Sequence, residues 1–163
     1  METPVNTTAI PQPRVFYYAG FWKRFLAYIL DQIIMSIVAF FIIVPFLAMI
    51  GISLWSSDFE PSGDFIMTII SAYIMMILLL VAGEWLYFAL MESMKGATLG
   101  KMALGITVTD MNGNRITFGR ASGRYFGKIL SSLTFGIGYI MAGFTAQKQA
   151  LHDMIASCLV INK

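Results

Sequence analysis

Two apolar stretches decide the class of this protein. They are FLAYILDQIIMSIVAFFIIVPFLAMI at residues 25–50 and FIMTIISAYIMMILLLVAGEWLYFAL at residues 65–90. A helix needs roughly 20 apolar residues to cross the hydrocarbon core of a bilayer, and both stretches exceed that length. We therefore predict a membrane protein with two transmembrane helices, at about residues 25–50 and 65–90.

The composition supports this class and excludes others. Of 163 residues, 58% are hydrophobic and 12% are charged, whereas soluble domains carry about 25% charge. A net charge of +2 is too small to indicate a nucleic-acid partner. Cys158 stands alone, so an internal disulfide and a cysteine metal cluster are excluded. No nucleophile–base motif or metal-ligand spacing is visible, so we expect no enzyme, no cofactor and no metal.

Basic residues near the ends of the spans predict the orientation. Residues 14, 23 and 24 are basic and precede the first span, and six basic residues lie between positions 95 and 128 after the second. The loop at residues 51–64 has none. We expect a multi-pass protein of the bacterial inner (plasma) membrane with a cytoplasmic N-terminus and an outside loop 51–64. We also expect residues 1–13 to form an irregular tail.

A change of period indicates a small cytoplasmic β element. Apolar and polar residues alternate around Asn112-Gly113, which predicts a hairpin over residues 105–118. A three-residue loop with Asn114 at positive φ puts Val108 opposite Phe118 and the apolar side chains on one face. The run at 157–161 predicts a further strand that would steady this hairpin.

The third helical segment, at about residues 119–146, is rich in glycine and leaves its topology open. A spanning helix would put the C-terminus outside, away from the hairpin. A re-entrant or interfacial segment that turns near residues 135–138 keeps both on one side, and we favour this alternative. The fold class is thus an all-α membrane protein with two spans, this third segment and a small antiparallel β element.

Two acidic residues fall inside the predicted spans. Asp31 lies about 10 Å along the helix from Arg24, with Tyr28 between them on one face. Glu84 reaches a similar depth on the second span. A carboxylate at membrane depth costs roughly 2.5–3.5 kcal/mol. The pair either binds a proton or a small cation, or ties the helices together through Arg24 and Tyr28.

Two stripes of every fourth residue run along the start of the third segment. Gly119, Gly123 and Gly127 form a small-residue stripe that permits close helix contact. The basic stripe beside it holds Arg120, Arg124 and Lys128. We expect both stripes to face anionic lipid or a partner. The alternative is an arginine that reaches an intramembrane carboxylate or a phosphate.

These residues resemble the pattern of the RDD family of bacterial membrane proteins, named for one Arg and two Asp. Its Arg and first Asp match Arg24 and Asp31 in AGFWKRFLAYILD, and its second Asp matches Asp153 in ALHDMIASCLVI. The stretch ATLGKMALGITVTDMNGNRITFGRA is similar to the family's connecting segment. The resemblance covers residues 14–162. It implies transport of a ligand. Many relatives carry extra domains and we expect none here, so the resemblance also implies a role as a small or accessory subunit of a larger complex.

Two functions follow as expectations. The first is cation- or proton-coupled transport through an oligomer, since two or three helices cannot enclose a polar path alone. There Asp31 binds the ion, Glu84 is its partner, Arg24 tunes the site, and Asp153 is a gate or cap. The second is a non-transporting scaffold or accessory subunit of a larger complex, in which Arg24, Asp31 and Asp153 form a structural network.

Overall fold

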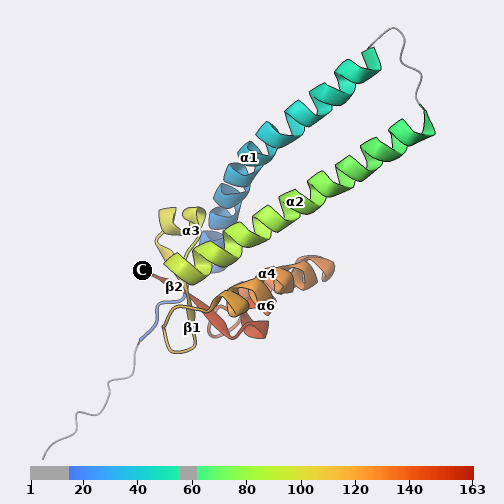
Figure 1. Ribbon diagram of the computed structural model, residues 1–163. Coiled ribbons are helices and arrows are strands. Elements are labelled where there is room, and N and C mark those ends of the chain that lie inside the picture. Colours follow the sequence, from blue (N-terminus) through green and yellow to red (C-terminus); the bar gives the residue numbers. More distant parts are fainter. Residues whose placement is uncertain (1–14, 56–61) are drawn as a thin grey trace, which may run out of the picture.

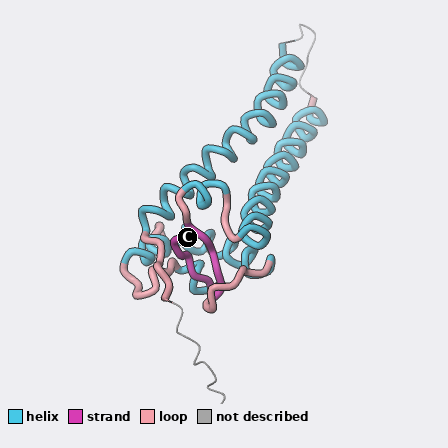
Figure 2. The backbone as a smooth tube through the Cα atoms, turned by 90° about the vertical axis from the view of Figure 1, so that its left-hand side faces the viewer, coloured by secondary structure: helices cyan, strands magenta, loops and turns pink. Residues whose placement is uncertain are grey.

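The computed structural model describes residues 15–55 and 62–163, and the predicted tail at residues 1–13 lies outside this part of the chain. Its two longest elements are helices α1 (Phe21–Trp55) and α2 (Gly63–Lys95). Both extend from a cluster of short elements toward the same side (Figures 1 and 2). Ser62 caps the start of α2 by accepting a hydrogen bond from the Phe65 amide at 3.2 Å. Gly96, at φ +76°, ends α2 in a left-handed conformation that costs glycine nothing.

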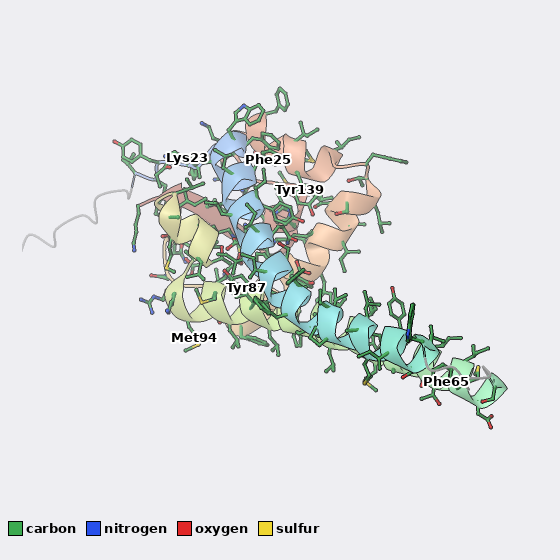
Figure 3. All side chains as sticks on the ribbon, turned by 90° about the horizontal axis from the view of Figure 1, so that it is seen from above. Lys23, Phe25, Phe65, Tyr87, Met94 and Tyr139 are labelled. Atoms are coloured by element: carbon green, nitrogen blue, oxygen red, sulfur yellow. The ribbon has the colours of Figure 1, made fainter. Side chains whose placement is uncertain are left out.

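Most of the length of both long helices is uncovered. In their most apolar 18-residue windows, none of α1 and 6% of α2 is buried, and side chains project outward along them (Figure 3). Pro45 lies inside α1 without ending it. An apolar surface of this extent requires lipid or a partner. Both helices are long enough to cross a bilayer, which confirms the two long apolar helices predicted from the sequence.

The short elements gather at the end of the pair where α1 begins and α2 ends (Figure 1). After α2 come α3 (Leu99–Ala103), β1 (Ile106–Asp110) and α4 (Phe118–Leu133). Then follow α5 (Ile137–Ile140), the 3₁₀ turn η1 (Met141–Gly143), α6 (Leu151–Ile155) and β2 (Cys158–Asn162). The buried core lies here, with Ile106, Val108 and Val160 at most 1% exposed.

The sheet differs from the predicted hairpin. Strand β1 pairs antiparallel with the C-terminal β2, with Val108 opposite Val160, so the predicted pairing of Val108 with Phe118 is wrong. Thr117 is instead the N-cap of α4, where its hydroxyl accepts from the Arg120 amide. The chain does turn where expected, but Gly113, not Asn114, takes the positive φ of +83°. The C-terminal strand is confirmed one residue further along.

The third segment is not one continuous helix. Helix α4 ends at Leu133, and Phe135 and Gly136, at φ +51° and +81°, turn the chain into α5. This turn falls at the position predicted from the sequence. Residues 15–55 and 62–163 contain two helices that meet the length and apolarity of a membrane span, and α4 is not one of them.

Candidate functional site

A buried ion pair joins the two ends of the chain. Nη1 of Arg24, in the first turn of α1, donates to Oδ2 of Asp153 on α6. The Nε of Arg24 donates to the Ala19 carbonyl at 3.0 Å, which fixes the guanidinium. Asp153 is 0% exposed and also accepts from the Ala150 amide at 3.1 Å. The carboxylate therefore holds the start of α1 against α6.

Arg124 extends this pair into a longer network. Its Nε donates to Asp153 at 2.7 Å and its Nη1 donates to Oε2 of Glu92 at 2.9 Å. Glu92 also pairs with the ammonium of Lys101. We call Arg24, Asp153, Arg124, Glu92 and Lys101 the ionic network. Each comes from a different helix, in the order α1, α6, α4, α2 and α3.

The charges of the network fix its protonation states. Burial alone would raise the pKa of Asp153, but the cations Arg124 and Arg24 hold it well below its ordinary value. Burial lowers the pKa of Arg124, yet Asp153 and Glu92 outweigh burial and raise it. Burial lowers the pKa of the adjacent His152 to about 3. Asp153 and Arg124 are therefore ionised at neutral pH, beside a neutral imidazole.

Asp31 lies outside the ionic network and caps α3. Its 0% exposed carboxylate accepts from the hydroxyl of Thr98 at 2.5 Å, from the hydroxyl of Tyr87 at 2.9 Å and from the Gly100 amide at 2.8 Å. A Cβ on Gly100 would lie 2.2 Å from the Ala27 carbonyl oxygen. Only glycine lets α3 approach α1 closely enough for this bond.

Glu84 has a different partner. Its Oε1 accepts from Nε2 of Gln32 at 3.0 Å, which links α2 to α1 one residue beyond Asp31. The hydrogen bonds of the two carboxylates share no residue. Tyr28, expected between Arg24 and Asp31, is 48% exposed. The structure therefore gives each carboxylate its own set of donors.

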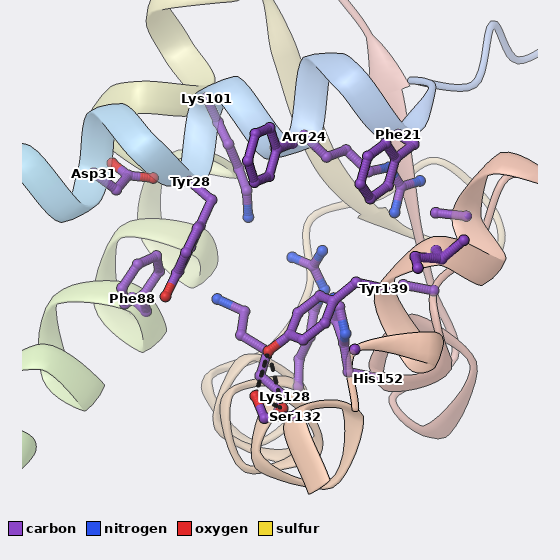
Figure 4. Close-up of a pocket in the computed structure, with 16 residues that line it drawn as sticks. Phe21, Arg24, Tyr28, Asp31, Phe88, Lys101, Lys128, Ser132, Tyr139 and His152 are labelled. Carbon is purple, nitrogen blue, oxygen red and sulfur yellow. Dashed lines mark hydrogen bonds between the residues drawn. The ribbon is translucent and has the colours of Figure 1, made fainter. Parts of the chain in front are cut away.

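A cavity of about 350 Å³ lies between α1, α4 and the segment from α5 to α6. Figure 4 shows the ammonium ends of Lys101 and Lys128 pointing into it, with Phe21, Tyr28 and Tyr139 around it. The Lys128 amine lies 3.9 Å from the centre of the Phe88 ring. Asp31 also borders the cavity. Positive groups and aromatic rings thus line the same cavity.

The two predicted stripes of α4 do not face one surface. Arg124 is 2% exposed in the ionic network and Lys128 borders the cavity, whereas Arg120 is exposed. Arg124 thus lies away from any surface that could contact lipid or a partner, and it binds the buried carboxylates of Asp153 and Glu92. Of the glycines, Gly127 packs against His152, where a Cβ would lie 3.1 Å from the His152 Cβ. A Cβ on Gly119 or Gly123 would meet no atom within 4 Å.

The sequence analysis missed three important residues. Glu92 and Lys101 complete the ionic network, and Thr98 binds Asp31. Glu92 lies just beyond the predicted second span, in the last turn of α2, where a charged residue is ordinarily solvated. A buried Arg124 would have required a carboxylate partner. The sequence does not show that Arg124 is buried, because its burial depends on how α4 packs on α2.

The comparisons with known proteins identify the family of this chain. Residues 18–157 match the RDD family, so the chain belongs to that family. It is 35% identical over 149 residues to "Uncharacterized protein YxaI" of Bacillus subtilis (strain 168), covering 89% of this chain and 97% of that protein. It is 30% identical over 152 residues to "Uncharacterized membrane protein YteJ" of the same organism, covering 90% and 82%. No solved structure matches. The chain is thus an RDD family membrane protein.

Proposed function

We propose that this protein is a membrane scaffold or accessory subunit that presents a rigid, ion-paired head at one end of a transmembrane helix pair. The observation that carries the proposal is the ionic network, which uses Arg24 and Asp153 to hold separate helices together. Asp31 has a similar use, because its hydrogen bonds fix α3 on α1. The three residues that give the family its name thus stabilise the head.

The distribution of charged residues between the two ends of the helix pair supports one orientation of this multi-pass protein in the membrane. Arg24, Lys101 and Arg124 lie at the head end, while the described start of α2 carries Asp64. Positive residues favour the cytoplasmic side of a membrane. The head and the N-terminus then lie in the cytoplasm of a bacterium, and the connection between α1 and α2 lies outside.

The test uses purified full-length protein in vesicles that contain a pH-sensitive dye. A scaffold conducts no protons when a Na⁺ or K⁺ gradient is imposed, and native mass measurement of gently solubilised membranes finds it in a larger complex. Asp153→Asn weakens that complex, whereas the exposed Arg120→Gln does not. Cation-dependent proton flux from the purified protein would overturn the proposal.

Cation- or proton-coupled transport through an oligomer is the second candidate. It is favoured by one observation, that the Asp31 carboxylate borders the cavity as well as capping α3. Asp31→Asn keeps an acceptor for the donors around it but removes the charge. Under this candidate the variant inserts normally and loses its pH-dependent flux, and unchanged flux rejects Asp31 as the ion-binding group.

A further inference from the structure

The cavity beside the ionic network has an excess of positive charge. The network contains the cations Arg24, Arg124 and Lys101 but only the carboxylates Asp153 and Glu92. Lys128 adds a further cation at the cavity wall. Asp31, also on that wall, accepts hydrogen bonds on both oxygens from uncharged donors. Counting Asp31, four basic side chains stand against three acidic ones, and this excess favours a negative charge in the cavity.

Two hydrogen-bond donors at this cavity have no acceptor. Nη2 of Arg24 is buried and makes no hydrogen bond with the described residues. Within the same residues, the amine of Lys128 has no carboxylate within ion-pair distance and contacts the rings of Phe88 and Tyr125. Lys128 is partly exposed, so Nη2 of Arg24 is the buried donor of the two. Buried donors are ordinarily satisfied, and one that is not calls for an explanation such as a bound ion.

The lowered pKa of Lys128 shows that its charged form lacks stabilisation by nearby negative groups. Burial lowers the pKa of Lys128 to about 7, and repulsion from Lys101 and Arg124 adds to this effect. Glu92 and Asp153 act in the opposite direction without restoring the ordinary value. An anion within hydrogen-bond distance would stabilise the charged amine.

The rest of the cavity is mostly apolar and reaches the exposed surface of α1. Phe21, Phe25 and Tyr28 line it from α1, and Ile140 lines it from α5. Phe25, Tyr28 and Ile140 are each between 43% and 49% exposed. Tyrosine, here Tyr28, is enriched at the level of lipid headgroups. A ligand held here can therefore place a charged group on the cations and a hydrocarbon chain on the rings.

We propose that this cavity binds one phosphate group carried by an amphiphile, held by Lys128 and the free Nη2 of Arg24. Phosphate oxygens accept charge-assisted hydrogen bonds from both kinds of donor. The phosphate-binding chemistry is common to a lipid headgroup and to free phosphate, and the apolar wall favours the lipid. The protein then carries a lipid-binding site at its head, beside the scaffold network.

The experiment is a titration of the full-length protein in a non-ionic detergent, followed by calorimetry and native mass measurement. The probes are short-chain phosphatidic acid, short-chain phosphatidylcholine and inorganic phosphate. We expect one phosphatidic acid per chain, bound about tenfold or more tightly than either other probe. Inorganic phosphate that binds as tightly as phosphatidic acid would assign the site to soluble phosphate and overturn the amphiphile.

Matched variants on α4 test whether Lys128 binds the phosphate group. Lys128→Gln lowers the affinity for phosphatidic acid about tenfold or more, and Lys128→Arg retains it. Arg120→Gln removes the same charge from the exposed surface of the same helix and leaves the affinity unchanged. Lys128→Met is the second variant in case an amide at this position disturbs folding. Equal losses in Lys128→Gln and Arg120→Gln, or no loss in either, overturn the proposal.

Discussion

Arg24 and Asp153 form a buried ion pair although 129 positions separate them in the sequence. The pair holds the first turn of α1 against α6 near the end of the chain. Asp153 also forms an ion pair with Arg124 on α4. The membrane helix pair and the short C-terminal elements are thereby one connected structure. This connection explains how the short elements after α2 keep a defined position against the start of α1.

Asp153→Asn tests the contribution of the ionic network to stability. Asparagine keeps an oxygen for the Ala150 amide but leaves the guanidinium of Arg124 in a buried site with less negative charge. Breaking one side of a buried ion pair costs about 3–5 kcal/mol. We expect a loss of that order in the free energy of unfolding, measured by denaturant titration in detergent. Arg120→Gln, on the exposed face of α4, serves as the control and changes it by less than about 0.5 kcal/mol.

Gly100→Ala tests the close approach of α3 to α1. The added Cβ would lie 2.2 Å from the Ala27 carbonyl oxygen and 3.0 Å from Cγ of Asp31, so α3 must move away and the cap on Asp31 weakens. Overpacking of this kind costs about 1–3 kcal/mol. Gly123→Ala, where a Cβ meets no atom within 4 Å, is the matched control and gains up to about 1 kcal/mol from helix propensity. Similar melting temperatures for the two variants would contradict the contact.

The parts of this fold that local sequence determines were predictable. The two apolar helices follow from run length, the strand near the C-terminus from its β-branched residues, and the turn at Phe135 and Gly136 from glycine content. The β pairing was not predictable, because Thr117 can continue an alternating pattern or cap a helix equally well. Its use as a cap frees β1 to pair with β2, a contact that depends on the whole head.

The candidate site was predictable only in part, for a similar reason. Asp31 stood out because a carboxylate is costly at membrane depth, and Arg24 and Asp153 stood out because they match the RDD family pattern. Their partners did not, because Glu92, Lys101 and Thr98 occupy ordinary positions at a helix end and a turn. Which acidic residue meets which cation is decided by how α4 packs on α2 and α6. A single sequence does not contain that information.

His152 provides a pH-dependent test of the head. Its pKa falls from 6.5 to about 3 on folding because burial disfavours the charged ring. Between these values the unfolded chain binds more protons than the folded one, so stability falls as the pH is lowered, by up to about 1.4 kcal/mol per pH unit. His152→Asn removes this slope between about pH 6 and pH 4. His152 is the single histidine of the chain, so unfolding curves that keep the full slope in the variant would contradict its neutral burial.

Lys128→Met separates stability from ligand binding. The pKa of Lys128 falls from 10.5 to about 7 on folding, mainly by burial. Between these values the unfolded chain binds the extra proton, so the lysine lowers stability near pH 7 and the penalty shrinks as the pH rises toward 10.5. Replacing a partly buried charge that has no ion-pair partner among the described residues by an apolar side chain raises the free energy of unfolding by something on the order of 1 kcal/mol. We therefore expect Lys128→Met to unfold at a higher temperature than the parent at pH 7, in detergent without added lipid, with a smaller difference at pH 9. A lysine retained at such a cost is consistent with a binding role, and a variant that is less stable at both pH values would show that Lys128 serves the fold instead.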